Sequence, residues 1–129
     1  MTATIGEGFL HELERVCGSG GIVRERLQLL TYETDALPYV RQEPAVVVLP
    51  GSADQVQQVV RLCAREGVPF VARGHGTGLS GGAVPVPGGV VIALPRLNRV
   101  LDIDMPNRRV TVEPGVTNLE ITRQVAPHG

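Results

Sequence analysis

Residues 70–85 read Phe-Val-Ala-Arg-Gly-His-Gly-Thr-Gly-Leu-Ser-Gly-Gly-Ala-Val-Pro, and this stretch decides how the chain is interpreted. Five glycines fall within residues 74–82, directly after a short apolar run that is typical of a buried strand. Glycine has no Cβ, so it tolerates positive φ and lets a ligand approach the backbone closely. Successive N–H groups turned to one side form an anion-binding concavity. The stretch therefore predicts a loop that binds a phosphate or a pyrophosphate.

Polar side chains within the loop support this interpretation. Thr77 and Ser80 add hydroxyl donors, and Arg73 places a fixed positive charge at the loop entrance. A flexible linker would rarely lie between two strand-like runs with such residues among its glycines. A tight structural turn, whose glycines merely allow the chain to reverse, remains an open alternative.

The loop does not fit the two best-known phosphate motifs. A Walker A loop needs a lysine, and all twelve basic residues of this chain are arginine. The pattern G-x-G-x-x-G occurs at 76–81, but in a dinucleotide fold it must open a helix. Here residues 83–89 are rich in proline and glycine, and residues 90–94 form another apolar run. The loop is therefore expected to join strand to strand.

Composition narrows the class of protein. The 129 residues suit one domain or part of one, and the net charge of −1 gives no reason to expect a nucleic-acid partner. No apolar run approaches the roughly 20 residues of a membrane span, and the N-terminus lacks signal-peptide features. Two cysteines are too few for a disulfide framework. We expect a cytoplasmic protein, or one peripheral to the inner membrane.

Hydrophobic spacing predicts the elements around the loop. Residues 1–30 suggest two helical pieces split by glycines at 18–21; Val23, Leu27 and Leu30 would share a face of the second. A strand is expected at 45–49, and another at 68–72. The helix between them would be capped by Ser52 and Gln55 and ended by Gly67. This right-handed βαβ unit implies parallel pairing of its strands. A hairpin at 100–104 and 109–113 and a helix capped by Thr117 or Asn118 would follow.

From these residues a family resemblance emerges. Residues 69–83 resemble the pyrophosphate loop of the FAD-linked oxidases of the vanillyl-alcohol oxidase / p-cresol methylhydroxylase (PCMH) type. Within that family they are most similar to glycolate oxidase FAD-binding subunits and D-lactate dehydrogenases. Further matches occur in the expected order at 32–36, 44–50, 96–98, 101–104 and 112–119.

The resemblance implies an α/β (α+β) fold. Residues 1–40 would be an N-terminal helical segment, and residues 41–129 the N-terminal portion of a PCMH-type FAD-binding domain. Its first subdomain would hold the βαβ unit and a small mixed sheet, and its second subdomain would be incomplete. The family continues with a second glycine-rich region and a substrate domain, where the catalytic residues are expected; we assign none here.

The resemblance also implies a site. The loop would bind the FAD pyrophosphate through the backbone, and the implied contacts are Arg73, Gly74, His75, Gly76, Thr77, Gly78, Ser80, Gly81, Gly82, Pro114 and Gly115. Some relatives attach their flavin covalently through a histidine of this loop, two positions after His75, where this chain has Thr77. The FAD is therefore expected to be non-covalent. His75 would contribute its amide and not its imidazole. Gly115 could equally be an ordinary turn residue.

The activity implied for the complete enzyme is oxidation of a 2-hydroxy acid such as glycolate or D-lactate, with hydride transfer to flavin N5. Electrons would pass to a membrane quinone, a partner subunit or another acceptor. Two alternatives stay open: a relative with other chemistry (an alkyl-glycerone-phosphate synthase or a sugar-lactone oxidase), or a non-catalytic remnant. The isolated chain is expected to be inactive and to bind FAD weakly or not at all.

Other polar residues carry weaker signals. Asp102 and Asp104 share one face of a predicted strand, as a metal pair might, but no histidine or cysteine lies near them in the sequence. His11 and His128 lack a matching set of ligands and are expected at the surface. Cys63 is expected to be a small buried hydrophobe.

Overall fold

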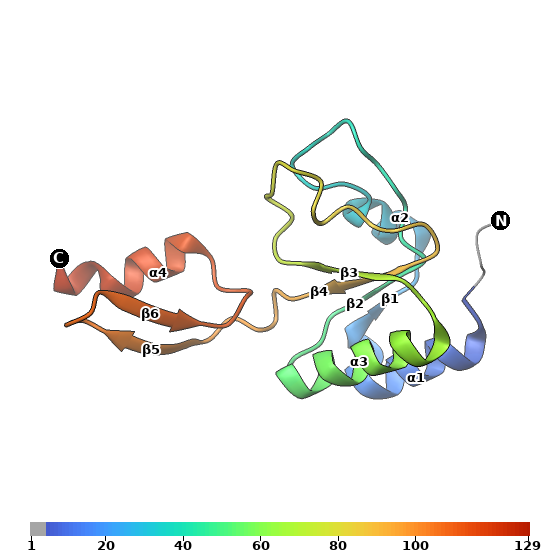
Figure 1. Ribbon diagram of the computed structural model, residues 1–129, viewed down its shortest axis with the longest axis horizontal. Helices are drawn as coiled ribbons and strands as arrows, with labels where there is room; N and C mark the ends of the chain where they lie inside the picture. Colours follow the sequence, from blue (N-terminus) through green and yellow to red (C-terminus); the bar gives the residue numbers. More distant parts are fainter. Residues whose placement is uncertain (1–4) are drawn as a thin grey trace.

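A four-stranded mixed sheet organises the larger part of the chain (Figure 1) in the computed structural model, which describes residues 5–129. The strand order is β1-β2-β4-β3. Strands β2, β4 and β3 run parallel, and β1 is antiparallel to β2. The strand bounds are β1 Ile22–Val23, β2 Val46–Val48, β3 Phe70–Arg73 and β4 Val90–Ala93.

Both faces of this sheet are covered, which explains why β2 and β4 are continuous apolar runs. Helices α1 (Glu7–Cys17) and α3 (Ala53–Glu66) lie on one face (Figure 1), where Leu13, Val59 and Cys63 are fully buried. The short helix α2 (Arg26–Leu29) and the 3-10 turn Leu30–Tyr32 lie on the opposite side. Their core comprises Leu29, Val47, Val91 and Ala93.

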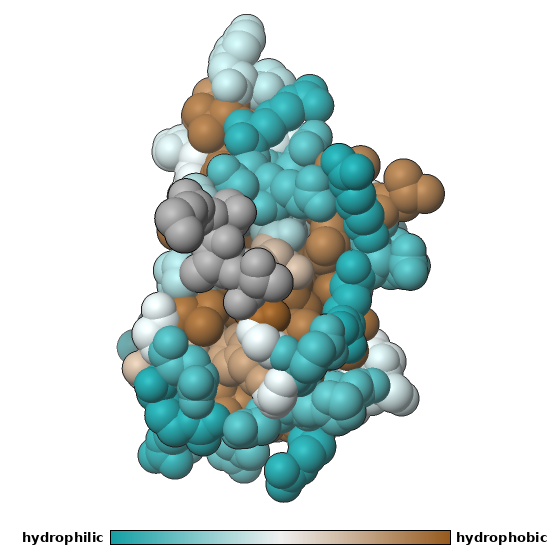
Figure 2. Space-filling model, turned by 90° about the vertical axis from the view of Figure 1, so that its right-hand side faces the viewer, coloured by the Kyte–Doolittle hydropathy of each residue, from teal (hydrophilic) through white to brown (hydrophobic). Residues whose placement is uncertain are grey.

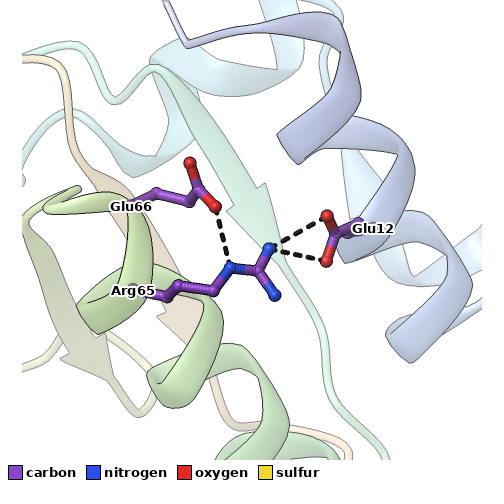
Figure 3. Close-up of polar contacts among 3 residues, drawn as sticks. All are labelled: Glu12, Arg65 and Glu66. Carbon is purple, nitrogen blue, oxygen red and sulfur yellow. Dashed lines mark hydrogen bonds and ion pairs between the residues drawn. The ribbon is translucent and has the colours of Figure 1, made fainter.

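An arginine connects the two helices on the first face (Figure 3). The Arg65 Nη2 of α3 donates to both carboxylate oxygens of Glu12 on α1, at 2.9 and 2.8 Å. Arg65 Nε also donates to Glu66 at 2.8 Å. All three side chains are partly exposed, so the group fixes the contact geometry and contributes little to stability.

The ends of α3 confirm the cap prediction with one difference. The Ser52 hydroxyl accepts the Gln55 N–H at 3.2 Å, and Gly67 adopts a left-handed φ of 65°. The Gln55 side chain accepts the N–H of Gly51 at 2.6 Å, one residue before the position that a capping box requires. The helix therefore begins and ends at the residues that the sequence indicated.

Two expectations are wrong, one about the second N-terminal helix and one about the pairing of the βαβ strands. The second N-terminal helix is largely replaced by β1, because the β-branched Ile22 and Val23 pair with the free edge of β2. The remaining helix α2 buries Leu29 and leaves Leu27 80% exposed. The strands β2 and β3 of the βαβ unit are parallel but do not pair with each other, because β4 lies between them.

A hairpin and a helix form a separate extension (Figure 1), as the sequence predicted. Strands β5 (Val100–Asp104) and β6 (Arg109–Val112) pair antiparallel, and α4 (Asn118–Val125) follows, with a 3-10 turn at Ala126–His128. Thr117 is the cap, since its hydroxyl accepts the Glu120 N–H at 3.2 Å. We call residues 5–97 the sheet unit and residues 98–129 the hairpin unit.

Figure 2 views the end of the molecule that lies opposite the hairpin unit. It shows apolar surface near the centre of this face, surrounded by hydrophilic side chains. Among the described residues, no helix is both long enough and apolar enough to cross a membrane.

Candidate functional site

The glycine-rich loop spans residues 74–89 between β3 and β4 and contains no helix, as predicted. It leaves the carboxyl end of β3 and crosses the α2 side of the sheet (Figure 1) before returning to β4. Because β3 and β4 are neighbouring parallel strands, the loop must span the length of the sheet, and it does so without secondary structure. Its main-chain polar groups are consequently not used by a helix or a ladder.

The main-chain N–H groups of residues 74–83 are unpaired in the part of the chain that the structure describes. Within residues 5–129, none of them donates a hydrogen bond to a protein acceptor. Buried N–H groups are nearly always paired, and exposed ones bond to water or to a ligand. Residues 77–80 are exposed, so their N–H groups can reach solvent or a bound anion. The loop is therefore an array of free donors at the protein surface.

Gly76 takes a conformation that other residues rarely adopt. Its φ is 71°, in the left-handed region. A Cβ at this position would overlap the guanidinium of Arg73, which lies against the loop. Gly81 has a similar φ of 74°. The two glycines set the path of the loop, and Gly76 keeps its backbone close to a positive charge.

Arg73 is held beneath the loop by residues from the segment before β2. Its Nη1 donates to the Thr34 carbonyl at 2.6 Å, and its guanidinium carbon lies 5.5 Å from the centroid of the Tyr32 ring. Within the part of the chain that the structure describes, Arg73 forms no ion pair with a carboxylate. Its charge is therefore available to an anion at the loop.

Asp35 is a site residue that the sequence analysis did not single out. It is buried next to the loop, and a Cβ on Gly78 would lie 3.9 Å from its Oδ2. Its Oδ1 accepts the Leu37 N–H at 2.8 Å, which is an Asx turn. The Thr34-Asp35 pair ahead of Pro38 is a sequence signal for such a turn, although it says nothing of burial.

The turn after β6 meets the start of the glycine loop, so the structure brings the two predicted parts of the site together. The His75 Nε2 donates to the Gly115 carbonyl at 2.9 Å, across 40 residues of sequence. Gly115 N–H in turn donates to the Leu97 carbonyl at 2.7 Å. Gly115 is buried, and a Cβ there would overlap the carbonyl oxygens of Leu94 and Leu97. Its packing is therefore tighter than that of an ordinary turn residue.

Two carboxylates of the hairpin unit and one buried thiol of α3 have perturbed pKa values. The hydrogen bonds from Arg99 hold the pKa of Glu113 below its usual value. The Asn107 side chain, its N–H and Arg109 likewise lower the pKa of Asp104. Asp104 thus bonds to its own hairpin, and no group of residues suited to a metal ion occurs in the described residues. Burial raises the pKa of Cys63 to about 11, so this thiol is an inert core group.

Comparisons with known proteins agree with this geometry. A family model described as an FAD binding domain matches residues 44–129. The glycolate oxidase subunit GlcD of Escherichia coli (strain K12) is 46% identical over 101 residues, or 78% of this chain and 20% of that protein. The D-lactate dehydrogenase of Anaerostipes hadrus is 35% identical over 91 residues, or 70% of this chain and 19% of that protein. The chain thus spans about a fifth of these relatives.

A solved structure confirms the expected fold class. p-Cresol methylhydroxylase with bound substrate superposes with a TM-score of 0.79 at 26% sequence identity. The match covers 96% of this chain and 26% of that one. Both the sheet unit and the hairpin unit are therefore parts of a known architecture.

Proposed function

Because this chain belongs to the FAD-binding domain family, we propose that its glycine-rich loop holds the pyrophosphate of FAD. The unpaired N–H groups of residues 74–83 carry this proposal, since a pyrophosphate needs several fixed donors on one side. Gly74, His75, Gly76, Thr77 and Gly78 would contribute them. Ser80, Gly81 and Gly82 would shape the turn, and Pro114 and Gly115 would border the site.

The residues present fit an anionic group. Arg73 supplies a positive charge whose guanidinium lies against Gly76. Gly76 is also the glycine at which a side chain would displace that charge. The tie between His75 and Gly115 holds the neighbouring turn against the loop, so the contacts from both segments would act on one ligand. A merely structural turn would have little need to leave its amides unpaired.

We also propose that the flavin is not covalently attached. Thr77 occupies the position where some related enzymes have a histidine that attaches the flavin, and a threonine hydroxyl is a poor nucleophile without a base. The imidazole of His75 is turned to the Gly115 carbonyl. Flavin that remains with the acid-precipitated protein would contradict this part of the proposal.

For the whole protein we propose oxidation of a 2-hydroxy acid, glycolate or D-lactate, in the cytoplasm or at the inner membrane. Relatives named for both activities support this. Bound FAD would supply the two-electron redox chemistry, while the chain supplies binding and electrostatics. The electron acceptor would be a quinone or a partner subunit. Since the chain spans about a fifth of those relatives, we expect no turnover from these residues alone and weak FAD binding.

Replacing Gly76 tests the loop proposal. Gly76→Ala should weaken FAD binding at least about tenfold, because the new Cβ strains a positive φ and displaces Arg73. Gly67→Ala is the matched control, since it carries a similar φ of 65° at the end of α3 with open space around it. Both changes should lower stability by about 1 kcal/mol. Equal FAD dissociation constants for the two variants would refute the proposal.

A further inference from the structure

Asp35 stands apart from the other charged side chains of the described residues, because it alone is buried, with 7% of its surface exposed. Burying a carboxylate is costly unless both oxygens find partners. One oxygen, Oδ1, has the Leu37 N–H at 2.8 Å. The other, Oδ2, has no hydrogen-bond partner in the described part of the molecule. The fold therefore retains an acceptor that it does not use.

The unused acceptor lies against the glycine-rich loop. Two hydrogen bonds fasten the Asp35 turn to the loop and to the end of β3 that leads into it. The Ala36 N–H donates to the Gly78 carbonyl at 3.0 Å, and Arg73 Nη1 donates to the Thr34 carbonyl at 2.6 Å. Gly78 adjoins Oδ2, since a Cβ built on this glycine would lie 3.9 Å from that oxygen. An orphan acceptor thus faces a backbone whose donors are also unpaired.

We propose that Asp35 is a positioning residue, whose Oδ2 accepts the main-chain N–H of Gly78 or Leu79 when the loop closes on its ligand. This inference rests on the proposed binding of FAD by the loop. A hydrogen bond from N–H to a carboxylate is charge-assisted and short, so it fixes the loop backbone strongly. The N–H groups that precede Gly78 are then directed outward to the pyrophosphate.

The proposal predicts that Asp35 Oδ2 strengthens FAD binding but lowers the stability of the free protein. In the free protein the orphan oxygen costs stability, because it has lost water and gained no partner. In the complex the same oxygen contributes a hydrogen bond. Neutralising it should therefore weaken binding without weakening the fold. A residue that merely supports the fold would lower both together.

The test uses Asp35→Asn in the full chain, because asparagine keeps an oxygen for the Leu37 N–H and replaces Oδ2 by a donor. FAD is titrated while amide resonances are followed, and the unfolding midpoint is measured separately. We expect the dissociation constant to rise about tenfold. The midpoint should stay equal or rise, and the downfield shift of the Gly78 or Leu79 amide proton on FAD binding should disappear. Asp102→Asn, which removes an exposed charge in the hairpin unit, should change none of the three.

The outcomes separate this inference from the proposed function. If FAD leaves the loop amides of the unaltered chain unmoved, the proposed function fails. If FAD moves them, and Asp35→Asn binds FAD as well as the unaltered chain does, only the role of Asp35 is refuted. A midpoint that falls together with the affinity would show a purely structural role. An equal loss of FAD affinity in Asp102→Asn would show a general effect of charge. Either this result or the combined fall of midpoint and affinity would overturn the inference.

Discussion

The sheet unit and the hairpin unit differ in how much buried apolar surface stabilises their folds. In the sheet unit all four residues of β4 are buried, and two clusters of apolar side chains fill both faces. In the hairpin unit, neither strand nor α4 contains a buried residue among those described. Among the described residues, the hydrogen bonds between the hairpin unit and the sheet unit are the two of Gly115, with the Leu97 carbonyl and with the His75 side chain.

This difference bears on the site, which takes residues from both units. The glycine-rich loop is anchored at both ends in the sheet unit, by β3 and β4, and from the side by the Asp35 turn. Pro114 and Gly115 lie on the weakly packed unit. We therefore infer that the loop geometry is set by the fold, whereas the second part of the site depends on a few contacts near His75.

Truncation of a core side chain should give the largest effect. Ile92 on β4 is 2% exposed, so Ile92→Ala should cost about 2–5 kcal/mol of unfolding free energy through lost burial and a cavity. Leu119→Ala, at a 58% exposed position of α4, should cost less than about 0.5 kcal/mol. Urea unfolding measures both. Similar losses of unfolding free energy in the two variants would show that side-chain burial stabilises the two units equally.

A substitution at Gly115 should disrupt the contact between the two units and cost less unfolding free energy than the core truncation. Gly115→Ala places a methyl group against the carbonyl oxygens of Leu94 and Leu97, and the strain should cost about 1–3 kcal/mol. Hydrogen exchange should speed up in the hairpin unit and stay unchanged in β4. Gly8→Ala is the control. Apart from its chain neighbours and the helix backbone, no atom of the described residues lies within 4 Å of a Cβ built on this helical glycine, and the change should stabilise α1 by about 0.5–1 kcal/mol. Uniform acceleration in both units would contradict the predicted weak join.

Acid should loosen the hairpin unit slightly before the sheet unit. Hydrogen bonds from Arg99 lower the pKa of Glu113 below its ordinary value of 4.5. The folded state thus gains stability that is fully present above that value and is lost as the pH falls through the lower folded-state pKa. Amide exchange in the hairpin, corrected for intrinsic rates, should rise as the pH falls below the ordinary pKa of 4.5. Glu113→Gln should remove part of this rise, and protonation of Asp104 should account for the remainder. An unchanged pH dependence of exchange in Glu113→Gln would refute the assignment to Glu113.

Local features were predictable from the sequence, and features that depend on distant contacts were not. The caps at Ser52 and Thr117 and the strand-to-strand path of the loop follow from neighbouring residues. The insertion of β4 between β2 and β3 depends on pairing across the sheet. The pairing of Val23 with β2 overrides the helical spacing of its own segment in the same way.

The site shows the same limit. The glycines and Arg73 were recognisable because the loop pattern is contained in one stretch of sequence. Asp35 was not, because its importance lies in burial against Gly78, 43 positions later in the numbering. The same holds for the bond between His75 and the Gly115 carbonyl, which only tertiary structure reveals.

The central claim is that free main-chain amides of residues 74–83 bind the diphosphate of a flavin nucleotide. The most direct measurement compares FAD with riboflavin, which has no phosphate, in an amide-resolved NMR titration of this chain. The account predicts that FAD shifts the resonances of residues 74–83 and that riboflavin leaves them in place. Equal shifts with riboflavin, or FAD shifts confined to other residues, would contradict it.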